Sequence, residues 1–453
     1  MKSELSAIES VLHLMDGDTL QSLLLEETQQ RQEEGYDVAA IWDKLELPKT
    51  KDQLVDIYKE LLNAPRNQEF SFYEPDGIEE IHAARPPGPR AAKISCSADD
   101  LYDRVYGGWL GRAAGCMLGK PVEIEAGWGK DELVKYLQLA NSYPLRNYIP
   151  RLDPMPPGFS LNRSSQGCCL GEINAVVEDD DTDYTILALH ILETYGVDFT
   201  TANVAAAWLE RLPYHRTYTA ERFTYRNLIL GVQPEEASQF LNPNREFIGA
   251  RIRIDTYGFA APGKPELAAR LAYRDSVLSH TKNGVYSAMF TAACIAWAFV
   301  TDDIDEIINT GLSEIPFNCR QAESIREAIA MRKQVDDWET AYERLLPKQA
   351  AYNFVHAINN TVWMVLALLY SGGDFEKAIS IAVTCGDDTD CNGANAGAVM
   401  GILHGARNLP EKWTAPLRDT LYTNISRWRE HRISELARRT VKMAENTLSK
   451  NQE

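Results

Sequence analysis

Two short acidic segments carry the residues best suited to chemistry. Residues 178–183 read EDDDTD, and about 200 positions later residues 385–393 read CGDDTDCNG. Carboxylates that converge on one spot repel one another strongly unless they hold cations. Oxygen ligands drawn from two distant segments suit Mg²⁺, Mn²⁺ or Ca²⁺, and two metal ions bridged by carboxylates would use so many acids.

Two plainer interpretations compete with a metal site built from both segments. Helix capping explains one or two Asp residues at a helix N-terminus, but not two whole blocks. An EF-hand is the other competitor, because Asp388, Asp390, Asn392 and Gly393 match its first ligand positions. Its twelfth position would be Val399 instead of the bidentate Glu, so the sequence excludes an EF-hand here.

Each acidic segment must be positioned by the element that follows it, and both are followed by helix-like sequence. Apolar residues recur at helical spacing in the ranges 184–195, 265–274, 285–300, 361–370 and 392–405, whereas alternation with period two is scarce. The sequence therefore predicts an all-α protein with long loops. The residues Leu417, Leu421, Ile425 and Trp428 predict a further amphipathic helix near the C-terminus.

A glycine stripe follows the second acidic segment. Gly393, Gly397, Gly401 and Gly405 recur every four residues on one predicted helix. Each glycine costs about 1 kcal/mol relative to Ala inside a helix. Four on one face predict a bare groove where another helix packs closely and helps hold the acidic loop in place.

Composition narrows the class of protein. The chain has 453 residues, of which 45% are apolar and 25% charged, with a net charge of −19. This charge argues against binding to nucleic acid or to an anionic membrane surface. The most apolar stretch, residues 285–300, is shorter than the roughly 20 residues needed to span a bilayer. Eight cysteines without a CxxC pair and an acidic N-terminus predict a reduced, cytoplasmic protein.

Prolines divide the chain into two parts. Pro86, Pro87 and Pro89 interrupt any helix there, because proline fixes φ and removes a donor. We expect a helical N-terminal extension over residues 1–95 and one domain over residues 96–453 that includes the C-terminal helices.

Three ordered motifs carry a resemblance to a known family. The two acidic segments and residues 107–123, GGWLGRAAGCMLGKPVE, resemble the ADP-ribosylglycohydrolase family and occur in that family's order. The stretches 242–253 and 278–284 also look similar. The resemblance covers roughly residues 100–410 and leaves the N-terminal extension outside it.

The resemblance implies an all-α, compact orthogonal multi-helix fold around a centre with two Mg²⁺ ions. In the family the metals bind the ribose hydroxyls and a water, and a glycosidic bond to ADP-ribose is hydrolysed. Carried over by motif, the metal ligands are Asp180, Asp181, Asp388 and Asp390, while Glu123 and Asp181 are the catalytic carboxylates. The implied substrate-binding residues are Asn242, Gly249, Arg253, Ser279, His280, Asn283 and Asn392. From the residues themselves, a structural ion pair for Arg253 and a structural role for His280 stay open.

Three departures from the family pattern bear on the substrate. Asp179 and Cys391 stand where the family usually has hydroxyl residues, and Cys116-Met117 replaces a pair that includes an acid. A neutral thiol is a poor ligand for a hard cation. We therefore hypothesise that Asp179 is an additional metal ligand that compensates for Cys391 and leaves a more negative site.

The sequence leaves three functions in competition. The first is metal-dependent hydrolysis of an ADP-ribosylated small molecule or protein side chain, with Mn²⁺ or Ca²⁺ as alternatives to Mg²⁺. The second is a metal-dependent glycosidase that acts on another furanoside or on a nucleoside. The third is a non-catalytic binding or structural protein on the same fold. No nucleic-acid or membrane partner is expected.

Overall fold

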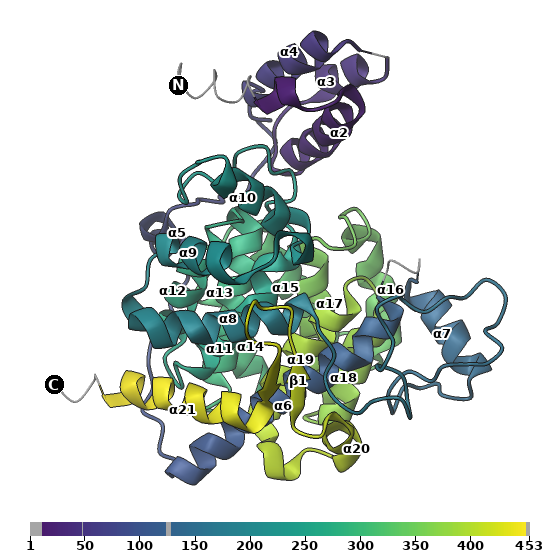
Figure 1. Cartoon of the computed structure of the whole chain (residues 1–453), viewed down its shortest axis with the longest axis vertical. Coiled ribbons are helices and arrows are strands. Elements are labelled where there is room, and N and C mark those ends of the chain that lie inside the picture. The colour runs from purple at the N-terminus through teal and green to yellow at the C-terminus, as the bar shows by residue number, and fades with distance from the viewer. Residues whose placement is uncertain (1–10, 48, 124–127, 450–453) are drawn as a thin grey trace.

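The computed structural model describes residues 11–47, 49–123 and 128–449, and in this part of the chain the fold is all-α, as predicted (Figure 1). The first helices are α2 (Gly17–Glu33), α3 (Ala39–Leu45), α4 (Lys51–Leu62), α5 (Ile78–Ala84), α6 (Ala98–Gly119), α7 (Lys130–Leu139), α8 (Asp180–Tyr195), α9 (Thr201–Arg211) and α10 (Thr219–Ile229). They continue as α11 (Asp255–Phe259), α12 (Pro265–Ser276), α13 (Lys282–Trp297), α14 (Ile304–Leu312), α15 (Arg320–Arg332), α16 (Trp338–Gln349), α17 (Ala357–Ser371), α18 (Phe375–Thr384), α19 (Thr389–His404), α20 (Glu411–Thr414) and α21 (Ile433–Ser449). The 3₁₀ segments are η1 (Lys120–Val122), η3 (Gly196–Asp198), η4 (Tyr214–Arg216), η5 (Ile248–Arg253), η6 (Ala406–Asn408) and η7 (Ala415–Leu417).

The long apolar runs form helices at the centre of the molecule. Every residue of α13 and of α17 is buried, so most of the apolar stretch 285–300 forms a core helix. No helix in the described ranges is long and apolar enough to cross a membrane. All eight cysteines lie within the described residues and are free.

The glycine stripe of α19 packs against a second glycine stripe on α6. A Cβ atom built on Gly107, Gly111 or Gly115 would overlap the backbone carbonyl of Gly401, Gly397 or Gly393, respectively. The backbones of the two helices are therefore in direct contact along several turns, as the stripe predicted. Because α19 begins next to the second acidic segment, this contact fixes the position of that segment in the core.

The prediction of a helix through Leu417, Leu421 and Trp428 is wrong. The chain instead forms a small hairpin, in which β1 (Thr420–Tyr422) pairs antiparallel with β2 (Glu430–Arg432), with Leu421 opposite His431. Arg418 and Asp419 adopt left-handed φ values of 49° and 51°, which end the preceding helical turn. Leu421 and Ile425 are still buried in the core. The apolar spacing therefore indicates which residues are buried, although the segment is not a helix.

The N-terminal helices have a small core of their own. Leu20, Leu24, Leu54 and Leu61 form an apolar cluster that also includes Leu241 of the main body, and Phe223 and Phe240 pack against it. Figure 1 shows α2, α3 and α4 together at the top, next to the larger body that contains α6, α8, α13, α17 and α19. Ile81 of α5 already belongs to the main core.

Candidate metal centre

The first acidic segment lies at the N-terminus of α8. Asp179 is the N-cap residue, and its Oδ1 accepts a hydrogen bond from the backbone N of Asp181 at 2.9 Å. Asp180 and Asp181 are the first two residues of the helix. Free N–H groups and the helix dipole favour negative charge at this position, so the fold stabilises carboxylates here.

The second acidic segment is held by polar side chains of α17. Asp387 has a left-handed φ of 59°, and its Oδ2 accepts hydrogen bonds from Asn359 at 2.8 Å and from Trp363 at 2.7 Å. The backbone N of Asp388 donates to Asn360 Oδ1 at 3.1 Å. These bonds hold the loop in its left-handed conformation and so fix the position of Asp388.

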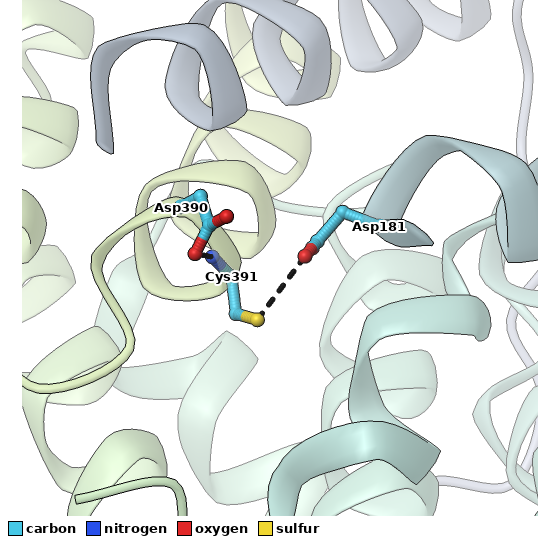
Figure 2. A group of neighbouring side chains, drawn as sticks. All are labelled: Asp181, Asp390 and Cys391. Carbon is cyan, nitrogen blue, oxygen red and sulfur yellow. Dashed lines mark hydrogen bonds between the residues drawn. The ribbon is translucent and has the colours of Figure 1, made fainter. Parts of the chain in front are cut away.

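The two segments meet, as the sequence analysis predicted for the halves of one site. Ligand atoms of Asp181, Asp390 and Cys391 lie within 4.8 Å of one another, and so do those of Glu123, Asp388 and Asp390. Figure 2 shows Asp181 on α8 facing Cys391 on α19, with the thiol donating to Asp181 Oδ2 at 3.1 Å. Asp390 belongs to both groups, each of which could hold a metal ion.

The negative charge of the acids in this centre is poorly balanced by the surrounding protein groups. Burial, followed by repulsion from neighbouring carboxylates such as Asp390, raises the pKa of Asp181 and of Asp388 well above the usual value. Asp388 Oδ1 is buried and has no hydrogen-bond partner among the described residues. An oxygen-rich site with an unsatisfied carboxylate atom fits a hard divalent cation.

Two basic side chains lie beside the centre. Lys120 forms a buried ion pair with Asp179 Oδ2. Arg112 of α6 donates to the backbone O of Asp181 at 2.5 Å and to its Oδ1 at 3.2 Å. Lys120 thus balances the charge of Asp179, and whether Asp179 leaves a more negative site than the family's hydroxyl residue stays a prediction. Whether Asp179 binds metal stays a prediction.

Glu123 lies across from the acids at the edge of a cavity of about 290 Å³. Its Oε2 accepts a hydrogen bond from Asn162 Nδ2 at 3.0 Å, and the backbone N of Asn162 donates to Pro121 O at 2.9 Å. The cavity is also lined by Arg216, Tyr218, Thr219, Gly249, Phe354 and Val355. Carboxylates thus line this cavity together with two basic side chains, Lys120 and Arg216.

Arg253 and His280 do not line this cavity. Arg253 is buried and forms ion pairs with Asp275 and with Glu221, the latter at 2.8 Å, while its Nη2 donates to Ser279 Oγ at 2.8 Å. His280 is buried, and burial lowers its pKa well below the usual value, so the ring is neutral. The structure thus gives both residues the structural role that the sequence left open.

Three amides predicted to bind substrate are also engaged inside the protein. Asn242 donates to Ser279 O at 2.9 Å, and Asn283 donates through Nδ2 to Glu246 Oε1 at 2.7 Å. Asn392 donates to Asn360 Oδ1 at 2.8 Å, behind the second acidic segment. Of the seven residues predicted to bind substrate, Gly249 is the one that lines the cavity.

Sequence reasoning missed the roles of Lys120, Asn162 and Asn360. Lys120 had a signal, because it lies three residues before Glu123 in a motif already singled out. Asn360 stands beside Asn359 at the start of an apolar helix, a position from which amides can hold a neighbouring loop. Asn162 lies in a long loop and offers no local signal.

Comparisons with known proteins agree with the motifs. The sequence model of the ADP-ribosylglycohydrolase family matches residues 97–449. An uncharacterized protein of Archaeoglobus fulgidus is 27% identical over 316 residues, which cover 68% of this chain and 90% of the relative. A solved ADP-ribosylglycohydrolase-related protein complex contains a chain with 18% identity and a TM-score of 0.49, covering 77% of this chain and 99% of that one.

Proposed function

The chain belongs to the ADP-ribosylglycohydrolase family, and from this premise we propose that it is a metal-dependent hydrolase of a glycosidic bond to ADP-ribose. The observation that carries the proposal is the convergence of Asp181, Asp388 and Asp390 from segments about 200 residues apart. The substrate would be an ADP-ribosylated small molecule or protein side chain.

The residues that would hold the cations are Asp180, Asp181, Asp388 and Asp390, with Asp179 as a further candidate. When bound, two Mg²⁺ ions would supply electrostatic orientation of the ribose hydroxyls and activation of water. Cleavage of a glycosidic bond passes through an oxocarbenium-like transition state, whose positive charge neighbouring carboxylates would stabilise electrostatically.

Glu123 is the carboxylate best placed to accept a proton from the attacking water. Asn162 holds its Oε2 at 3.0 Å and so orients the group at the cavity edge. Its carboxylate also lies close to Asp388 and Asp390, so a water activated among the candidate metal ligands would be within its reach. Asp181 is the second candidate, and Arg112 fixes its position.

Arg216 is the candidate partner for the diphosphate of the substrate. Its exposed side chain is in the cavity wall, and a guanidinium can donate two parallel hydrogen bonds to a phosphate. Lys120, in contrast, is already paired with Asp179. We therefore assign the diphosphate to the Arg216 side of the cavity.

The test is to incubate the full chain with ADP-ribosyl-arginine, ADP-ribosyl-serine and a panel of nucleosides, with Mg²⁺ and with a chelator. Release of ADP-ribose that the chelator and Asp388→Asn both abolish is the expected result. Asp302→Asn, a change to an exposed acid outside the cavity, should leave the rate unchanged. Cleavage of nucleosides alone would replace the proposal with a nucleoside hydrolase. If Asp388→Ala raised thermal stability and Mg²⁺ caused no shift, a non-catalytic protein would be favoured.

A further inference from the structure

The N-terminal extension is fixed to the main body by buried ion pairs. Arg245 binds Glu27 and Glu34 of the extension, each at 2.7 Å, and Lys282 binds Glu34 at 2.6 Å. All four side chains are at most 8% exposed. Because burying charges away from water is costly unless they are well paired, these contacts specify one position for α2.

A second set of contacts supports the same placement. Arg320 binds Glu74 of the extension and Glu246 of the main body, each at 2.8 Å. Gln30 of α2 donates to Glu246 Oε2 at 2.8 Å. The segments around residues 245 and 282, which the family resemblance placed on the substrate side, therefore hold the extension.

This docking creates a second cavity, which we call the α2 cavity. Its volume is about 520 Å³, and it lies between Glu26 and Glu33 of α2 and the rings of Phe247 and Phe354 in the main body. Thr219, Phe354 and Val355 line both this cavity and the one at the metal centre. The two cavities are therefore neighbours, with these three residues at their common boundary.

The α2 cavity is acidic. Its wall contains Glu26 and Glu33 and no Lys or Arg. Among the described residues, neither acid has a Lys or Arg ion-pair partner, and the imidazole of His356, 3.5 Å from Glu33, is neutral because burial lowers its pKa to about 3. Burial raises the pKa of Glu33 to about 7. Both acids would be stabilised by a cation from outside the protein.

We infer that the α2 cavity is a subsite for a positively charged segment of the substrate on the leaving-group side of the scissile bond. This inference rests on the proposed function. The ADP-ribose portion carries a diphosphate, which Glu26 and the ionised form of Glu33 would repel. Lys or Arg side chains of a modified polypeptide have the opposite charge, and the rings of Phe247 and Phe354 offer faces that attract such cations. The preferred substrate is therefore an ADP-ribosylated polypeptide with basic residues next to the modified one.

The experiment uses two peptides with the same ADP-ribosylated residue, flanked in one by two lysines and in the other by two glutamates. The full chain should hydrolyse the lysine-flanked peptide with a kcat/KM larger by about tenfold, and high salt should reduce this preference. The double variant Glu26→Gln, Glu33→Gln should lose most of the preference. The matched variant Glu435→Gln, Glu445→Gln, on exposed positions of α21, should keep it.

A small ADP-ribosylated compound without a peptide separates this inference from the function on which it rests. If the compound is hydrolysed but the two peptides are cleaved equally well, the α2 subsite is overturned and the proposed function stands. If nothing is hydrolysed, the proposed function fails, and the subsite is judged by binding of the unmodified lysine-flanked peptide, measured by fluorescence anisotropy. Equal binding to the wild type and to Glu26→Gln, Glu33→Gln would then overturn it.

Discussion

Gly397→Ala tests how tightly the helix contact behind the metal centre must close. The new Cβ would lie 2.7 Å from the carbonyl carbon of Gly111 and closer still to its oxygen. Real Cβ atoms essentially never come within 3.0 Å of another group, and the obstacle here is backbone that cannot rotate away. The helices α6 and α19 must therefore separate, and the displaced part of α6 includes Arg112, which holds Asp181.

The size of the effect follows from two opposing terms. Forcing extra volume into a packed core costs about 1–3 kcal/mol, and a backbone obstacle favours the upper end of this range. The gain in helix propensity from Gly to Ala offsets about 1 kcal/mol. We therefore expect Gly397→Ala to lower the free energy of unfolding by about 2 kcal/mol.

The assay is urea unfolding followed by circular dichroism, together with Mn²⁺ binding by calorimetry. Gly17→Ala is the control, because a Cβ at this helical position meets nothing within 4 Å. It should be neutral or stabilising. If Gly397→Ala also unfolded at the wild-type urea concentration and bound Mn²⁺ equally well, the contact would not position the centre as argued.

Three further predictions concern individual charges. Asp388→Asn should weaken Mn²⁺ binding at least about tenfold in calorimetry, because it removes a carboxylate of the group formed with Glu123 and Asp390; wild-type affinity would exclude this centre as the binding site. Lys120→Met leaves buried Asp179 unpaired and should cost about 3 kcal/mol in urea unfolding, which adding Asp179→Asn should largely restore. Burial raises the pKa of Glu33 from 4.5 to about 7. The folded protein therefore binds the carboxyl proton more tightly than the unfolded chain does. The stability that this raised pKa provides is lost as the pH rises through 7. Glu33→Gln should therefore be more stable than the wild type at pH 8, by up to about 3 kcal/mol, and equal to it near pH 4; a difference independent of pH would contradict the pKa shift.

Features that depend on neighbouring residues could be predicted from the sequence. The apolar runs became α8, α12, α13, α17 and α19, and the stripe from Gly393 onward correctly predicted a close helix contact. Its partner stripe on α6 was present in the motif at residues 107–123 but was not identified. The C-terminal error arose because the spacing of Leu421 and Ile425 fits a helix and also fits a hairpin that packs on the core.

Features that depend on distant partners could not be predicted. Asn283 carries no local sign that its partner is Glu246, a residue that also binds Gln30 and Arg320. The family resemblance alone placed Asn283 beside the substrate. The meeting of the two acidic segments could be predicted more easily. Their acids are too many for helix capping, and acids that repel one another need a common reason to lie together.

The buried ion pairs of the N-terminal extension also set an order of events during synthesis on the ribosome. Glu74 precedes its partner Arg320 by 246 positions, which corresponds to roughly 12–50 s of translation at typical rates. The cluster of Leu20, Leu24, Leu54 and Leu61 lies almost wholly within the extension and can form early. Until the chain up to Arg320 has emerged, the docking surface of the extension is exposed to water. Water solvates the charged side chains of this surface during that time. Charged side chains at this interface therefore keep the nascent extension soluble at the stage when an apolar surface would invite aggregation.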